Sequence, residues 1–205
     1  MSLFLDLRKH GKLAEKRNPM YEKSKFGKFW MYFMFVFWAG YLIFFGTTFA
    51  FGFSDMVPNR EPYHVMNAVA LIFILALDFL LRIPFQKTPT QEVKPYLLLP
   101  VKRNRVIDFL LIRSGLSLFN LFWLFLFVPF SFITITKFFG ISGVITYLIG
   151  ILLLIIANNY WYLLCRTLIN ERIWWILLPI AFYGGIGCLL FIPEDSPLFY
   201  FFMDL

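Results

Sequence analysis

The chain has 205 residues, of which 60% are hydrophobic, 21% are aromatic and only 15% are charged, with a formal net charge of +7. Soluble domains carry about 25% charged residues, so this composition excludes a water-soluble globule, and it also excludes a disordered chain. It predicts an all-α integral membrane protein, a polytopic bundle of about five transmembrane helices preceded by an N-terminal interfacial helix.

Residues 1–28 are predicted to form a basic cytoplasmic segment. Leu3, Phe4 and Leu7 are apolar, and basic residues occupy the positions around and after them. This pattern is typical of a helix that lies in the cytoplasmic interface of a membrane. Pro19 is predicted to break the helix before the first span.

Residues 29–205 are predicted to form the transmembrane domain. A helix that crosses a bilayer needs about 20 mostly apolar residues, and the chain contains five continuous runs that approach or exceed this length. The predicted spans are 29–53, 62–83, 106–133, 138–168 and 173–193. Cys165 and Cys188 both fall within apolar runs and are predicted to be small buried side chains.

The positions of lysine and arginine predict the orientation. Of the 19, all but Arg60 and Lys137 lie before the first span, from the end of the second span into the third, or near the turn between the fourth and fifth. The positive-inside rule makes these segments, and the N-terminus, cytoplasmic. Because anionic lipid attracts such charges at the membrane surface, membrane lipid is the expected partner of the basic face and nucleic acid is not.

The cytoplasmic loop 84–105, between the second and third spans, is the most informative stretch. Pro84 is predicted to end the second span, and Arg105 marks the start of the third. Between them lies an apolar segment too short to span a membrane, which must lie against the membrane or against another protein. This segment and the basic residues after it are Pro95, Tyr96, Leu97, Leu98, Leu99, Pro100, Lys102 and Arg103.

This order of elements resembles the membrane-spanning permease subunits of ATP-binding-cassette exporters. In particular, it resembles an uncharacterised bacterial permease-like family with the same leucine-proline-basic loop, and the resemblance covers residues 1–192. In those exporters the corresponding loop forms a coupling helix that docks on an ATPase subunit. The resemblance therefore implies a multi-pass protein of the bacterial cytoplasmic (inner) membrane that exports a small or amphipathic compound.

The same resemblance implies the partners and the docking residues. A separate cytoplasmic ATP-binding subunit would dock on residues 88–103, and the chain would form a homodimer or pair with a second permease half. The docking face would be Tyr96, Leu97, Leu98 and Leu99, bounded by Pro95 and Pro100 and anchored by Lys102 and Arg103. Permeases of this type usually have six spans or a doubled set. Residues 198–205 are either the start of a sixth span in a longer protein or an aromatic tail.

No catalytic residue, cofactor or metal site is predicted. The only histidines are His10 and His64, and no glycine-rich phosphate loop is present in the sequence, so any ATP would bind another subunit. Two other functions remain open. The main alternative is a non-transporting integral membrane scaffold or assembly factor, and the third is a membrane enzyme.

Polar residues inside the spans are the remaining site candidates. Asp78 can pair with Arg82, four residues later on the same helix, or with Arg113 on the neighbouring helix. Such a pair either fixes the helix register or acts as a gate that opens during transport. The asparagines of the spans are expected to form hydrogen bonds between helices or to contact substrate. The full candidate set is Asp78, Arg82, Arg113, Asn120, Asn158 and Asn159.

Overall fold

A computed structural model describes residues 9, 13, 25–56, 61–86 and 103–189. The chain is helical through nearly all of these residues and contains no strand among them, as the sequence predicts. Most of the predicted interfacial segment and of the predicted docking loop lies outside the described residues, as do residues 190–205.

The first helical unit is α3 (Lys25–Met56), which contains the predicted span 29–53. The second unit consists of α4 (Pro62–Val65), the π-helical turn η1 (Met66–Ala70) and α5 (Leu71–Phe85). This unit exceeds the predicted span 62–83, because Pro84 does not end the helix.

Pro84 is accommodated near the last turn of α5. A proline removes one backbone donor, but the turn around it remains closed, since the Gln86 N–H donates to the Arg82 carbonyl at 2.8 Å. The helix therefore extends to Phe85 and brings Gln86 beside the preceding turn.

The predicted third span is divided into three helices rather than one. They are α7 (Arg103–Gly115), α8 (Leu118–Phe122) and the first part of α9 (Leu124–Glu171). Asn120 is the physical reason for the first break, because its side-chain amide donates to the carbonyl oxygens of Ser114 at 3.2 Å and Gly115 at 2.6 Å. The Ser114 carbonyl also accepts the Ser117 N–H at 3.2 Å, and the carbonyls at the end of α7 are thereby supplied with hydrogen-bond donors in an apolar surrounding.

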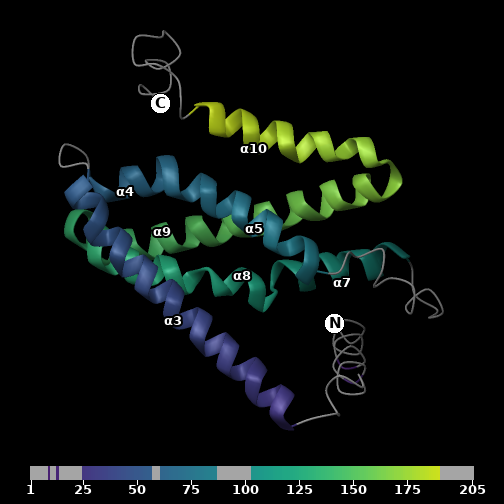
Figure 1. Ribbon diagram of the computed structural model, residues 1–205, viewed down its shortest axis with the longest axis horizontal. Helices are drawn as coiled ribbons and strands as arrows, with labels where there is room; N and C mark the ends of the chain where they lie inside the picture. Colours follow the sequence, from purple (N-terminus) through teal and green to yellow (C-terminus); the bar gives the residue numbers. More distant parts are fainter. Residues whose placement is uncertain (1–8, 10–12, 14–24, 57–60, 87–102, 190–205) are drawn as a thin grey trace.

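The long helix α9 is a hairpin of two helices. Gly140 has φ 65° and ψ −167°, a conformation outside the helical region and open to glycine because it has no Cβ. Figure 1 shows that the chain reverses here, so that 124–139 and 141–171 lie side by side. Their rings meet across the hairpin, with the Phe130 and Tyr147 centroids 6.4 Å apart.

The last described unit is η3 (Ile173–Ile176) followed by α10 (Leu177–Leu189), which runs back along the second part of α9 (Figure 1). The Trp161 and Phe182 rings pack 4.8 Å apart between these two helices. Cys165 is buried, but Cys188 on α10 is exposed, so the prediction of a buried side chain is wrong for Cys188.

The main apolar core joins α3, η1, α5 and α9, together with Trp123 between α8 and α9. Its members include Met66, Phe127, Phe130 and Ile155, all at most 1% exposed. The outer surface is rich in large apolar side chains, above all along α3, where Phe29 through Phe51 include many exposed rings. A surface of this kind is suited to lipid rather than to water.

By length and composition, two described helices can cross a membrane, namely Tyr32–Phe53 within α3 and α9 taken over its whole length, Leu124–Glu171. The bent pair of α4 and α5 makes a third if it counts as one span. Ile173–Cys188 is apolar but shorter. The structure is therefore that of an all-α protein with two to three helices able to span a membrane.

Candidate functional site

Polar side chains gather in a buried cluster where α5, α8 and α9 meet. Asp78 and Arg82 come from α5, Asn120 comes from α8, and Asn158 and Asn159 come from the second part of α9. Asn158 is 8% exposed and each of the other four is 0% exposed. We call these five residues the polar cluster.

The centre of the polar cluster is an ion pair within α5. The Arg82 Nε donates to Asp78 Oδ2 at 2.8 Å, and its Nη2 donates to Oδ1 at 3.0 Å, so the contact is bidentate. The spacing of four residues brings both side chains to one face of the helix. A buried pair is tolerated only when its remaining lone pairs and protons are also bonded.

The Asp78 carboxylate meets this requirement through two further donors. Trp123 Nε1 donates to Oδ1 at 2.7 Å, and Asn158 Nδ2 donates to Oδ2 at 2.8 Å. The carboxylate therefore accepts four hydrogen bonds from three other residues. The pair carries no net charge, so it places no uncompensated charge inside the bundle.

The Arg82 guanidinium is equally well bonded. Its Nη1 donates to Gln86 Oε1 and to Asn159 Oδ1, each at 2.9 Å, and its Nη2 donates to Asn120 Oδ1 at 2.8 Å. The ring of Phe119 lies 5.0 Å from the guanidinium carbon. All five N–H groups of an arginine are thereby used, with partners on three helices.

Gln86 and Ser114 connect the polar cluster to the helices on either side of the 87–102 loop. The Gln86 side-chain amide donates to Asn159 Oδ1 at 2.6 Å and to the Ser114 hydroxyl at 2.9 Å. Gln86 is the last described residue before the loop, and Ser114 lies on α7, which begins at Arg103 directly after it. Helices on both sides of the loop are therefore bonded to the same side chains.

A tyrosine on α10 completes the contacts. The Tyr183 hydroxyl donates to Asn158 Oδ1, whose own amide reaches Asp78 and also the Leu75 carbonyl at 3.0 Å. Asn158 therefore links α10 to α5 by hydrogen bonds, and the Tyr183 and Phe79 rings also pack directly, with their centroids 5.3 Å apart.

The structure brings together every intramembrane candidate except Arg113. The Arg113 side chain is exposed on α7, and the Asp78 carboxylate is bonded by Arg82 instead. Of the two pairings that the sequence leaves open for Asp78, the structure shows the local one. Sequence reasoning missed Gln86, Ser114, Trp123 and Tyr183, although Gln86 could have been found from its spacing of four residues after Arg82.

The predicted docking segment Pro95–Pro100 and Lys102 lie outside the described residues, while Arg103 is the first residue of α7. Within the described ranges, no three His, Cys, Asp or Glu side chains lie close enough to hold a metal ion.

Comparison with known proteins gives one match. No curated protein and no solved structure matches the chain. A family of unknown function, DUF5687, matches residues 12–194, which is most of the sequence. The chain therefore belongs to the DUF5687 family.

Proposed function

We propose that this chain is the transmembrane permease subunit of an ATP-driven exporter that moves a small or amphipathic compound. It is coupled to a separate ATPase subunit through the 88–103 loop. The observation that carries the proposal is the position of the polar cluster, which is bonded to the helices at both ends of that loop.

A force on the loop has a direct path to the polar cluster. Displacement of the loop moves the end of α5, where Gln86 is bonded to Asn159 on α9 and to Ser114 near the far end of α7. Arg82 is bonded to the same glutamine at 2.9 Å. Coupling between distant sites requires an element with two discrete arrangements, and a buried hydrogen-bond network that changes partners is such an element.

The proposal places five spans in the membrane, of which α3, the α4–α5 unit and the two parts of α9 supply most of the length. The short helices α7 and α8, which complete the broken third span, and the shorter α10 lie beside them (Figure 1). Discontinuous helices are frequent in transporters, because irregular backbone within a membrane is tolerated where protein covers it.

One observation favours the alternative, a non-transporting scaffold. Arg82 uses all of its donors and Asp78 accepts four hydrogen bonds, as expected of a buried pair that only stabilises the fold. A permease in one resting state has the same appearance. The two functions differ in the partner, because only the permease requires an ATPase subunit.

The test is purification of the tagged full-length protein in mild detergent, followed by mass spectrometry and an ATPase assay. We expect a stoichiometric subunit with a phosphate-binding loop, and we expect Leu98→Asp to remove it, because a buried charge opposes docking of an apolar face. Ile173→Asp is the matched control, since this exposed residue lies outside the loop on the side predicted to be cytoplasmic.

Loss of the ATPase in Leu98→Asp alone supports the permease. Wild-type protein that purifies without any ATPase favours the scaffold, and an ATPase retained by Leu98→Asp contradicts docking through the loop. Membrane insertion of each variant is checked by its recovery from the membrane fraction.

A further inference from the structure

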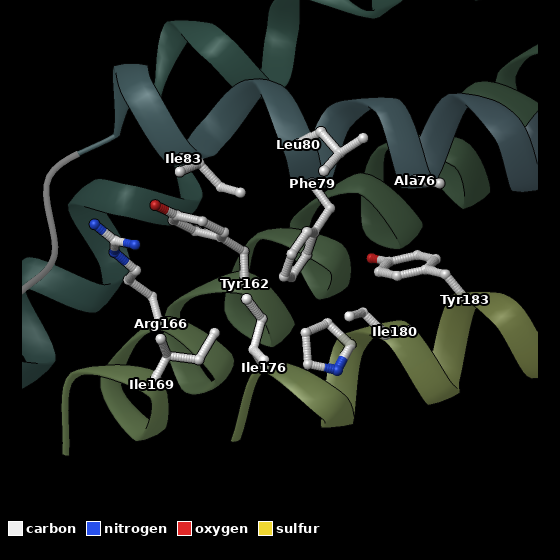
Figure 2. Close-up of a pocket in the computed structure, with 11 residues that line it drawn as sticks. Ala76, Phe79, Leu80, Ile83, Tyr162, Arg166, Ile169, Ile176, Ile180 and Tyr183 are labelled. Carbon is white, nitrogen blue, oxygen red and sulfur yellow. The ribbon is translucent and has the colours of Figure 1, made fainter. Parts of the chain in front are cut away.

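A groove lies between α5, the second part of α9 and the η3–α10 unit, and none of the functions discussed above uses it (Figure 2). Its volume is about 430 Å³, which falls within the range of small-molecule sites. Its lining includes Phe79, Leu80 and Ile83 of α5, Arg166 of α9, and Ile176 and Ile180 of the η3–α10 unit.

The walls of the groove are apolar and open toward the outside of the bundle. Leu80 on α5 and Ile180 on α10 are each 61% exposed, and Ile83 and Ile176 are exposed beside them. Phe79 forms part of the inner wall and is 7% exposed. In a membrane, an opening between two helices with such side chains admits an acyl chain from the surrounding lipid.

One end of the groove carries a positive charge. Figure 2 shows the Arg166 guanidinium beside the Tyr162 hydroxyl, at the end away from Tyr183. Arg166 is half-buried, and among the described residues it forms no ion pair. A partly desolvated guanidinium without a carboxylate partner attracts an anion, and phosphate is a group that arginine binds well.

The charged end lies at the side of the bundle where the 87–102 loop begins. The Tyr162 hydroxyl donates to the Gln86 carbonyl at 3.4 Å, and Gln86 directly precedes the loop. The positive-inside rule makes this side cytoplasmic, and the cytoplasmic leaflet is rich in anionic headgroups. The positive charge of Arg166, its position at the predicted cytoplasmic side and the apolar walls of the groove therefore all favour an anionic lipid.

We propose that the groove binds one anionic phospholipid of the cytoplasmic leaflet, with its phosphate at Arg166 and an acyl chain between α5 and α10. The site requires membrane insertion but no ATPase, so it goes beyond the proposed function. Its occupant would contact Tyr183, which is bonded to Asn158 of the polar cluster. Lipid in the groove is thus one side chain away from the polar cluster.

The test uses the full-length protein in nanodiscs of phosphatidylcholine that contain a minor fraction of phosphatidylglycerol, with native mass spectrometry of the released protein. Wild-type protein should retain one phosphatidylglycerol. Arg166→Gln should lower this retention about tenfold, because one charge-assisted contact is lost. Arg172→Gln is the matched control, since this exposed arginine lies on the same side and does not line the groove.

A second variant tests the apolar part of the site. Ile180→Trp places a bulky indole ring in the groove, so it should displace the lipid. Because Ile180 is exposed, the fold and Arg166 should be retained. Thermal unfolding of each variant confirms that it is folded.

Three results would overturn the site. They are equal retention by Arg166→Gln and wild type, an equal loss in Arg172→Gln, and equal retention of phosphatidylcholine and phosphatidylglycerol. Because no ATPase is present, these results do not depend on whether the permease proposal holds.

Discussion

Arg82 is the residue on which the buried contacts of this protein depend most. Its guanidinium is 0% exposed and bonds to Asp78, Asn120, Asn159 and Gln86. A buried ion pair adds little stability relative to an apolar pair of the same shape, because both charges are desolvated. Removing one partner is different, since it leaves the other charge buried and unpaired.

We therefore expect Arg82→Leu to lower the free energy of unfolding by about 3–5 kcal/mol, and Asp78→Leu by a similar amount. The double variant should lose much less than the sum, because neither charge then remains unpaired. The measurement is reversible unfolding in mixed detergent micelles. The matched cycle of Asp78→Leu with Arg113→Leu should be additive within about 0.5 kcal/mol, and additive losses in the Asp78–Arg82 cycle would contradict the pairing.

The identity of the buried residues could be predicted from the sequence, but their pairing could not. Asp78, Arg82, Asn158 and Asn159 stand out because polar side chains are rare in apolar runs. The choice between Arg82 and Arg113 as the partner of Asp78 depends on how α5 and α7 are rotated, and no local pattern contains that information. Trp123 was missed for a different reason, because an aromatic residue in an aromatic-rich chain carries no distinguishing signal.

Some helix ends can be predicted from the local sequence, and others cannot. Ser117 begins α8 by accepting the Phe119 N–H at 3.3 Å, and Gly115 ends α7 two residues earlier. A glycine is a typical signal for the end of a helix and a serine for the start of the next one. The break in the predicted third span could therefore have been predicted from Gly115 and Ser117. The reversal at Gly140 requires a left-handed conformation, and its neighbour Lys137 marks the region only approximately.

The contact between α3 and α9 depends on a single glycine. A Cβ added at Gly46 would lie 2.2 Å from the Leu126 carbonyl oxygen and 2.9 Å from Pro129 Cγ. Such a contact with backbone cannot be relieved by a side-chain rotation, so the two helices must separate. We expect Gly46→Ala to lower the free energy of unfolding by about 1–3 kcal/mol through overpacking.

Gly40 and Gly52 provide the control for this prediction. Both lie in α3, and a Cβ added at either position meets nothing within 4 Å. Gly40→Ala and Gly52→Ala should therefore be neutral or stabilising by about 0.5–1 kcal/mol, since alanine is the better helix former. If Gly46→Ala behaves like these two variants, α3 does not approach α9 as closely as the structure shows.

The arrangement of the whole bundle agrees with the distribution of charge. In Figure 1 the end of α5, the start of α7 and the turn between α9 and α10 lie at one end, and the reversal within α9 lies at the other. The sequence places Arg103 and Arg172 at the first end and Lys137 at the second. The side with most of the basic residues is the one that the positive-inside rule predicts to be cytoplasmic.

This arrangement predicts that the second part of α9 crosses the membrane, which cysteine labelling in intact cells can test. Lys137 and Arg172 lie at opposite ends of 141–171, and both side chains are exposed. In a Cys188→Ser parent, where the remaining Cys165 is buried, a membrane-impermeant maleimide should not react. Lys137→Cys should then react in intact cells, whereas Arg172→Cys should react only after permeabilisation.

The outcome shows whether 141–171 crosses the membrane and in which direction. If both cysteines react from the same side, 141–171 does not cross, and the polar cluster cannot lie at membrane depth between the predicted spans. If the sides are reversed, with Arg172→Cys accessible in intact cells, the 87–102 loop faces away from the cytoplasm. No cytoplasmic ATPase could then dock on it, and the permease proposal would fail together with the orientation. The predicted pattern keeps the loop, Arg166 and the anionic leaflet on one side, as both proposals require.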